Sequence, residues 1–286
     1  MIRISGMRPL LLGLLVCSLL ACGADNSESP PPEIPNRAAA EPTEEPAPPR
    51  EEPGTREAPP DHGFPEDAWN TILATYVTDA GFRYAALRGN DEHVAILGNV
   101  VRAVETADTS SFSRDEALAF YINAYNVLTI HSVLELWPVE SVMQEEGFFD
   151  GRTHTVAGEE MTLNGLENDI IRSKERFGEP RIHFAVNCAS VGCPPLQRES
   201  FTAENLERLL AAGAQSFVRN TTRIDRRRNR IEATKLFEWF ADDFGGAAGV
   251  REFIASQLEG EDAELVRRDR TRITHFDYDW AINAAP

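Results

Sequence analysis

Apolar side chains recur three and four positions apart in several long segments, which is the spacing of helices with one buried face. This pattern predicts helices over residues 64–81, 91–108 and 202–220. Shorter segments with strand-like composition flank tight turns and predict two hairpins, at 152–163 and 221–236. Helices and strands follow one another without a regular alternation, so the sequence favours an α+β fold over a doubly wound sheet. We expect a single domain of mixed helices around a small, mostly antiparallel sheet.

One further predicted helix is apolar on nearly all of its sides. Ser113 and Glu116 have the spacing of a capping box at its start, and Pro138 stops it after Trp137. A helix without a polar face is expected in the interior of the domain. The segment at 82–89 precedes this helix in the chain and is predicted to be extended.

Three polar residues interrupt this apolar helix. At about 100° per residue, Asn123, Asn126 and His131 fall on one broad face. A buried amide without a partner costs roughly 1–3 kcal/mol, so these side chains must meet other polar groups. They form a structural network that fixes a neighbouring loop, or they line an active site, and the two roles are compatible.

The segment RIHFAVN, residues 181–187, predicts a buried strand that ends at Cys188. On such a strand His183 and Asn187 share one face, while Cys188 points to the other, roughly 16 Å from His183. A direct pair of His183 and Cys188 is therefore not expected. If Cys188 acts as a thiolate nucleophile, His131 on the buried helix is the preferred base.

The first 22 residues have the pattern of a signal peptide, with two arginines, an apolar run from Leu10 to Leu20, and Cys22. The run is too short to span a bilayer comfortably. Its end resembles a bacterial lipobox, which implies cleavage before Cys22 and lipidation of that cysteine. Gly23 in the next position favours the outer membrane. We therefore expect a lipoprotein of the cell envelope that faces the periplasm.

Residues 23–61 are rich in proline and glutamate and show no apolar period. Such a segment cannot bury enough apolar surface to offset its chain entropy, so a disordered, semi-rigid tether is predicted. The remaining residues, 62–286, form the predicted globular domain and are numerous enough for a sizeable core.

The chain contains 46 acidic and 28 basic residues, and its net charge is −18. Because nucleic acids and anionic lipids repel acidic proteins, partners of these kinds are not expected for the domain. The expected partners are the membrane, through the lipid on Cys22, and a small-molecule or protein ligand. No cofactor is expected.

The chain has four cysteines. Cleavage before Cys22 would remove Cys17, and lipidation would use Cys22, so two cysteines, Cys188 and Cys193, would remain in the mature domain. In an oxidising compartment the simplest state for this pair is a disulfide. A zinc site would need a second pair of ligands, and no histidine spacing supplies one, so no metal is predicted. A free, nucleophilic Cys188 remains the alternative.

Six blocks in order over residues 75–284 resemble the family known as domain of unknown function 547. They are YAAL, FSRDEALAFYINAYNVLTIHSVLELWPVESV, GRTHTVAGEEMTLNGLENDIIR, GEPRIHFAVNCASVGCPPL, LFEWFADDFGG and DYDWAIN. The resemblance brings no activity with it. It implies recurring polar positions at Asn123, Asn126, His131, Glu167, Arg172, His183, Cys188 and Asp279. We take Glu167, Arg172 and Asp279, together with Asn187, as candidate binding residues.

Two functional hypotheses follow, and the residues leave open whether the domain is an enzyme. In the first it is a hydrolase or transferase that uses Cys188, with His131 as base, Asn123 and Asn126 as orienting groups, His183 nearby, and loop amides as oxyanion donors. In the second it is a non-catalytic ligand-binding or scaffold module with a structural Cys188–Cys193 disulfide. A buried helix followed by a histidine-bearing strand is also similar in order to papain- and transglutaminase-like enzymes, although the usual helix cysteine is absent.

Overall fold

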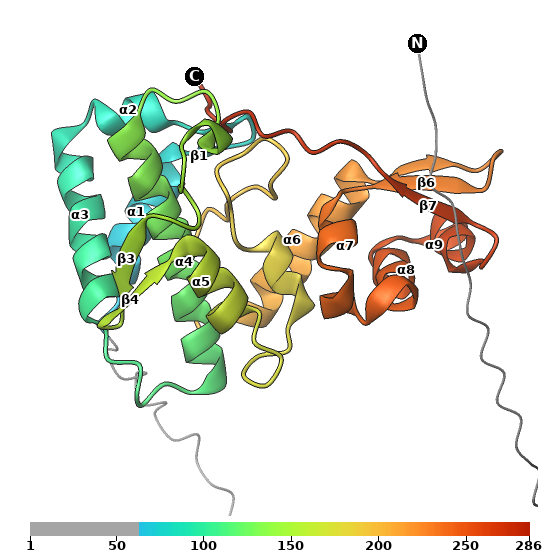
Figure 1. The fold of residues 1–286 in the computed structure, drawn as a ribbon, viewed down its shortest axis with the longest axis horizontal. Helices are drawn as coiled ribbons and strands as arrows, with labels where there is room; N and C mark the ends of the chain where they lie inside the picture. The colour runs from blue at the N-terminus through green and yellow to red at the C-terminus, as the bar shows by residue number, and fades with distance from the viewer. Residues whose placement is uncertain (1–62) are drawn as a thin grey trace, which may run out of the picture. The chain divides into compact units, whose positions relative to one another are not determined.

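The apolar helix predicted before Pro138 is α4 (Arg114–Leu136), and it lies buried among the other helices (Figure 1). The Ser113 side chain accepts a hydrogen bond from the Glu116 amide, and the Glu116 carboxylate accepts one from the Ser113 amide. The predicted capping box is therefore confirmed. By length and composition α4 could cross a membrane, but 94% of its most apolar window is buried inside the protein.

The computed structural model describes residues 63–286. The predicted signal peptide over residues 1–22, the lipidation of Cys22 and the tether over 23–61 lie outside the described residues, and all three stay predictions.

Three predicted helices are confirmed: α1 (Glu66–Tyr76), α3 (Asp91–Thr106) and α6 (Leu206–Thr221), the last ending one residue beyond its expected range. The prediction of extended chain at 82–89 was wrong, because this segment contains α2 (Tyr84–Arg88). Tyr84 and Leu87 are spaced by one helical turn and are fully buried, and α2 packs on α3 and α4. Tertiary burial therefore decides the conformation of a segment too short to show a helical period.

The strands described in residues 63–286 form three small sheets, with β1 (Val77–Thr78), β2 (Gly81–Phe82), β3 (Thr153–Val156), β4 (Glu159–Thr162), β5 (Arg223–Asp225), β6 (Arg230–Ala233) and β7 (Arg272–His275). All pairs are antiparallel except β6–β7, which is parallel. The predicted α+β class, with mixed helices and mostly antiparallel strands in a single domain, is confirmed. Both predicted hairpins are present, as β3–β4 and β5–β6.

The remaining elements are short helices: η1 (Val142–Gln144), α5 (Leu163–Gly165), η2 (Leu166–Ile171), η3 (Pro180–Phe184), α7 (Leu236–Trp239), η4 (Ala241–Phe244), α8 (Gly246–Gln257) and α9 (Gly260–Arg267). The strand predicted over 181–187 is wrong, because η3 occupies most of it. Pro180 sits in the first turn of η3, and the Glu179 carboxylate accepts a hydrogen bond from the Arg181 amide. These are helix-start features, and here they outweigh the apolar alternation that follows them.

The C-terminal segment, residues 276–286, runs from the end of β7 across the molecule to the β1–β2 hairpin (Figure 1). Its end pairs with Phe82, which donates to the Asn283 carbonyl and accepts from the Ala285 amide, at 2.8 and 2.9 Å. Midway it accepts a hydrogen bond from the Val191 amide at the Ala281 carbonyl. This segment therefore joins the core around α4 to the smaller cluster of buried residues around α8.

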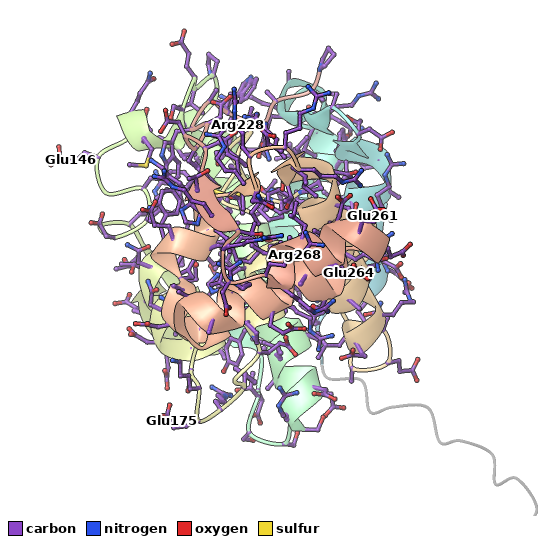
Figure 2. The ribbon with its side chains drawn as sticks, turned by 90° about the vertical axis from the view of Figure 1, so that its right-hand side faces the viewer. Glu146, Glu175, Arg228, Glu261, Glu264 and Arg268 are labelled. Atoms are coloured by element: carbon purple, nitrogen blue, oxygen red, sulfur yellow. A yellow bond between two sulfur atoms is a disulfide. The ribbon has the colours of Figure 1, made fainter. Side chains whose placement is uncertain are left out.

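The charged residues of the β5–β6 turn and of α9 point outward, as Arg228, Glu261 and Glu264 do in Figure 2. Arg226 in the turn pairs with Asp262 of α9 at 2.8 Å. The arginine-rich turn of the predicted hairpin at 221–236 is thus an exposed tip, and at least part of its charge is matched by local carboxylates.

Candidate functional site

A cavity of about 280 Å³ opens where η2, η3, α7 and the C-terminal segment meet. Six aromatic residues line it: Tyr125, Phe149, Trp239, Phe240, Tyr278 and Trp280. Its polar lining consists of Asn164, Glu167, Asn168 and His183, and the Cys188–Cys193 pair forms part of one wall. Mostly apolar walls with a few convergent polar groups are typical of small-molecule sites.

Three of these aromatic side chains contact one another. Trp239 and Trp280 are stacked, with ring centres 5.9 Å apart and planes at 25°. The Tyr278 ring lies 5.0 Å from Trp239 and 4.6 Å from Trp280. Trp239 is 45% exposed, an unusual position for so large an apolar side chain. Burial raises the pKa of Tyr278 to about 12, so its hydroxyl stays protonated near neutral pH.

Glu167 brings the carboxyl group of the cavity. The π-helical turn η2 carries it, and the short helix α5 separates η2 from the β3–β4 hairpin. Burial raises the pKa of Glu167, and the nearby His183, a hydrogen bond from Tyr125 and Arg172 only partly offset this effect. Burial and the charge of Glu167 likewise raise the pKa of Tyr125, so Tyr125 is the donor in this contact.

His183, Asp243 and Arg172 form a connected set behind Glu167. Asp243 Oδ2 accepts from His183 Nε2 at 2.8 Å and from Arg172 Nε at 2.7 Å. Burial alone would raise the pKa of Asp243, but these two hydrogen bonds hold it well below its usual range. The Phe240 ring stacks on His183 with centres 4.0 Å apart and contacts the Arg172 guanidinium at 4.6 Å. The His183 side chain is therefore fixed in orientation, with a proton on Nε2 that it donates to Asp243.

Asn123 and Asn126 have structural roles. Asn126 donates to the Ala185 carbonyl at 2.9 Å and accepts from the Asn187 amide at 2.8 Å. Asn123 makes the same pair of contacts with the backbone of Phe201, at 2.7 and 3.0 Å. Both amides are buried, and neither lines the cavity. They fix the chain between η3 and α6. Of the two roles predicted from the sequence, Asn123 and Asn126 therefore have the structural one.

Asn187 is also buried, and its side chain folds the loop that follows it. Its Oδ1 accepts from the Ala189 amide at 2.9 Å, and its Nδ2 donates to the Pro194 carbonyl at 2.7 Å. Asn283 of the C-terminal segment donates to the same Oδ1 at 3.2 Å. Asn187 thus holds the loop in shape from within and does not face a ligand.

Cys188 and Cys193 form a disulfide, as predicted. The Cys188 sulfur lies 3.2 Å from the Tyr278 hydroxyl, and the Cys188 amide donates to the Cys193 sulfur. Gly192 cannot be replaced without movement, because a Cβ there would lie 2.9 Å from the Tyr278 ring. Two of the predicted oxyanion donors are occupied, because the Val191 and Gly192 amides donate to the carbonyls of Ala281 and Asp279.

The structure does not bring His131 to Cys188. His131 lines a separate hollow with Glu135, Arg152 and His154, and its Nδ1 lies 4.0 Å from the Glu135 carboxylate. His131 lies near the edge of the α4 face that carries Asn123 and Asn126. At this edge α4 faces the β3–β4 hairpin. The histidine that lines the same cavity as Cys188 is His183. The predicted separation of these two residues assumed an extended strand, which the structure replaces with η3.

The other predicted binding residues take different positions. Glu167 lines the cavity, whereas Arg172 lies behind it on Asp243. Asp279 is exposed, and its carboxylate accepts from the Ala281 amide within the C-terminal segment. Within residues 63–286, no group of three or more His, Cys, Asp or Glu side chains has an arrangement that could hold a metal ion.

Sequence reasoning missed the aromatic wall and Asp243. Trp239, Phe240 and Asp243 come from the block LFEWFADDFGG, and Tyr278 and Trp280 come from DYDWAIN. Two large aromatic residues two positions apart in the polar, charged segment DYDW are the signal that could have indicated an exposed binding surface. The aromatic residues lie close to Glu167 only because of contacts between residues that are far apart in the sequence.

Comparison with known proteins gives one match. Residues 109–218 match the family described as "Protein of unknown function, DUF547". No curated protein and no solved structure matches the chain. The matched range contains Glu167, His183 and the disulfide, and the aromatic residues of α7 and the C-terminal segment lie beyond it. The similarity to papain- and transglutaminase-like enzymes stays a prediction.

Replacing Asn126 with alanine should lower the free energy of unfolding of the full chain by about 2–4 kcal/mol, because two buried backbone groups lose their partner. Asn220 is exposed on α6, where its side chain donates to the Ser216 hydroxyl, so Asn220→Ala should change stability by less than about 0.5 kcal/mol. Denaturant unfolding measures both. Equal effects of the two substitutions would contradict the structural role of Asn126.

Replacing Glu167 with glutamine should make stability less dependent on pH. Because burial raises the pKa of Glu167 above its unfolded value of about 4.3, folding loses stability as pH rises from there through the folded pKa. Glu167→Gln should match the parent near pH 4 and be the more stable protein at pH 7.5. Thermal unfolding at the two pH values tests this, and a variant less stable than the parent at pH 7.5 would contradict it.

Proposed function

We propose that this domain binds a small molecule in the cavity between η2, η3, α7 and the C-terminal segment. The observation that carries the proposal is the meeting of an aromatic wall with a desolvated carboxyl, Glu167, at the same opening. A cavity of about 280 Å³ is near the lower end of the usual range for small-molecule sites. It suits a small molecule or one terminal group of a larger one.

The closed disulfide favours binding over cysteine catalysis. A thiolate, not a disulfide, is the nucleophile that a hydrolase or transferase requires. The amides predicted to stabilise an oxyanion already donate to the C-terminal segment. In this state the Cys188–Cys193 pair is part of the cavity wall and constrains the loop that Asn187 holds.

A cysteine-dependent enzyme is the second candidate, and one observation favours it. Cys188 and His183 line the same cavity, and Asp243 orients His183 through Nε2. Nucleophile, base and orienting carboxylate are the three parts of a catalytic triad. This function would require reduction of the disulfide, and His183 replaces His131 as the base.

The location in the cell envelope is part of the proposal. It is supported by the sequence of residues 1–61, in which an apolar run ends at Cys22 and a proline- and glutamate-rich segment follows. A lipid on Cys22 would hold the domain at the outer membrane, facing the periplasm, with the tether as spacer.

Intact mass spectrometry of the protein extracted from membranes tests the anchor and the disulfide together. We expect a chain that begins at Cys22 with acyl groups attached and that takes up no alkylating agent until a reductant is added. An unlipidated N-terminus would contradict the anchor. A thiol at Cys188 that alkylates rapidly without reductant, at neutral pH, would favour the enzyme over the binding module.

A fragment panel tests binding in the cavity. Asn164 lies on its exposed rim, so Asn164→Trp should place a large ring over the opening and abolish fragment binding. Asn220→Trp adds the same ring on α6, away from the cavity, and should leave binding unchanged. Ligand-observed NMR on the full chain provides the measurement. If no fragment binds, or if both variants bind fragments equally, the proposed site is wrong.

A further inference from the structure

The chemistry of the cavity defines a class of ligand, and this step rests on the proposed function. We propose that the cavity binds a small organic cation of the ammonium class, with the charge held by Glu167 and by the faces of Trp239, Tyr278 and Trp280.

The carboxyl of Glu167 is short of partners. Its hydrogen bond comes from Tyr125, and the two basic groups nearest to it are already engaged. Arg172 donates to Asp243 and to Asn168, and His183 donates to Asp243. A partly buried carboxylate is costly unless it is paired, so a positively charged ligand would remove an existing penalty.

The aromatic wall is the second independent feature. Indole and phenol rings attract cations to their faces, and tryptophan attracts them most strongly. Trp239 and Trp280 line the opening in a near-parallel arrangement beside Tyr278. Phe240 is less available, because His183 and Arg172 contact its ring. Several aromatic rings around one cation are the usual arrangement for recognising quaternary ammonium groups.

An anionic ligand fits the cavity poorly. The loop amides that could have formed an anion-binding site donate to the carbonyls of Ala281 and Asp279. Arg172 is neutralised in part by Asp243, His183 already donates to the same carboxylate, and Glu167 would repel a second negative charge. The chain as a whole carries a net charge of −18, which raises the local concentration of cations and lowers that of anions.

Cation binding should depend on pH through Glu167. The groups that face its carboxyl are Tyr125 of α4, His183 of η3, Arg172 just after η2, Asp243 of η4 and Tyr278 of the C-terminal segment. Tyr125 and Tyr278 stay protonated, and Asp243 stays ionised, across the neutral range. Affinity should therefore fall on acidification as Glu167 takes up a proton.

The test compares two probes of nearly the same shape on the full chain. Choline carries a quaternary ammonium, and 3,3-dimethylbutan-1-ol replaces its nitrogen with carbon. We expect choline to bind at least about tenfold more tightly at pH 7.5, and acidification to reduce this preference. Isothermal titration or NMR titration measures both affinities.

Glu167→Gln should weaken choline binding by about tenfold and leave the neutral alcohol unaffected. Glu175→Gln is the matched control, because this substitution removes the same charge from the chain. Glu175 points into solvent and does not line the cavity (Figure 2). Trp239→Leu keeps an apolar side chain without a π face, and should weaken choline by about fivefold. It also serves as the test if Glu167→Gln does not fold.

The outcomes separate this inference from the proposed function. Equal binding of choline and the alcohol would overturn the cation proposal and leave the cavity as a binding site. Binding of other fragments, blocked by Asn164→Trp, without binding of choline would do the same. Choline binding that Glu167→Gln and Trp239→Leu leave unchanged would place the cation elsewhere. If no probe or fragment binds, both proposals fail.

Discussion

The structure depends on a buried side-chain amide that takes the place of a sheet neighbour. The chain after η3 is irregular, so its backbone groups have no strand to pair with, yet they lie in the interior. Asn126 of α4 meets this need by bonding to Ala185 and Asn187 at once, and Asn123 does the same for Phe201. An apolar helix can carry these two amides because their partners are backbone groups at fixed positions. Without them, the segment that bears the cysteines would have no defined path.

The cavity follows from this path and from one long-range connection. Asn187 and the disulfide shape the loop from within, and the C-terminal segment closes it from outside through Val191 and Gly192. The same segment carries Tyr278 and Trp280 to the mouth of the cavity, opposite Glu167 on η2. Segments far apart in the sequence thus place a carboxyl and three aromatic rings at one opening. A desolvated carboxyl does not help folding, which is why we assign it to ligand recognition.

The sequence predicts the elements whose signals are local. The capping box of α4, the helical periods of α1, α3 and α6, and the two hairpins all follow from residues close together in the chain. The strand expected over 181–187 fails because alternation in a short apolar segment cannot be separated from a buried helical turn by pattern alone. Because of that error, a direct pair of His183 and Cys188 was not expected, and His131 was preferred as the base. His131 was misplaced for a related reason. Helix angles put it on the same broad face as Asn123 and Asn126, but they do not show which neighbouring element packs against each part of that face. Asp243, Trp239 and Tyr278 join the site only through tertiary contacts, which composition does not reveal.

The central claim is that the carboxyl of Glu167 faces a ligand that carries positive charge. It is tested most directly by following the 13C signal of this carboxyl by NMR, assigned with Glu167→Gln, through a pH titration with and without choline. Binding and ionisation at one site are reciprocally linked, so a cation held by this carboxylate must lower its pKa. We expect the free protein to show a pKa for Glu167 above its usual value, and a clear decrease at saturating choline. A carboxyl that titrates identically with and without choline would contradict the account.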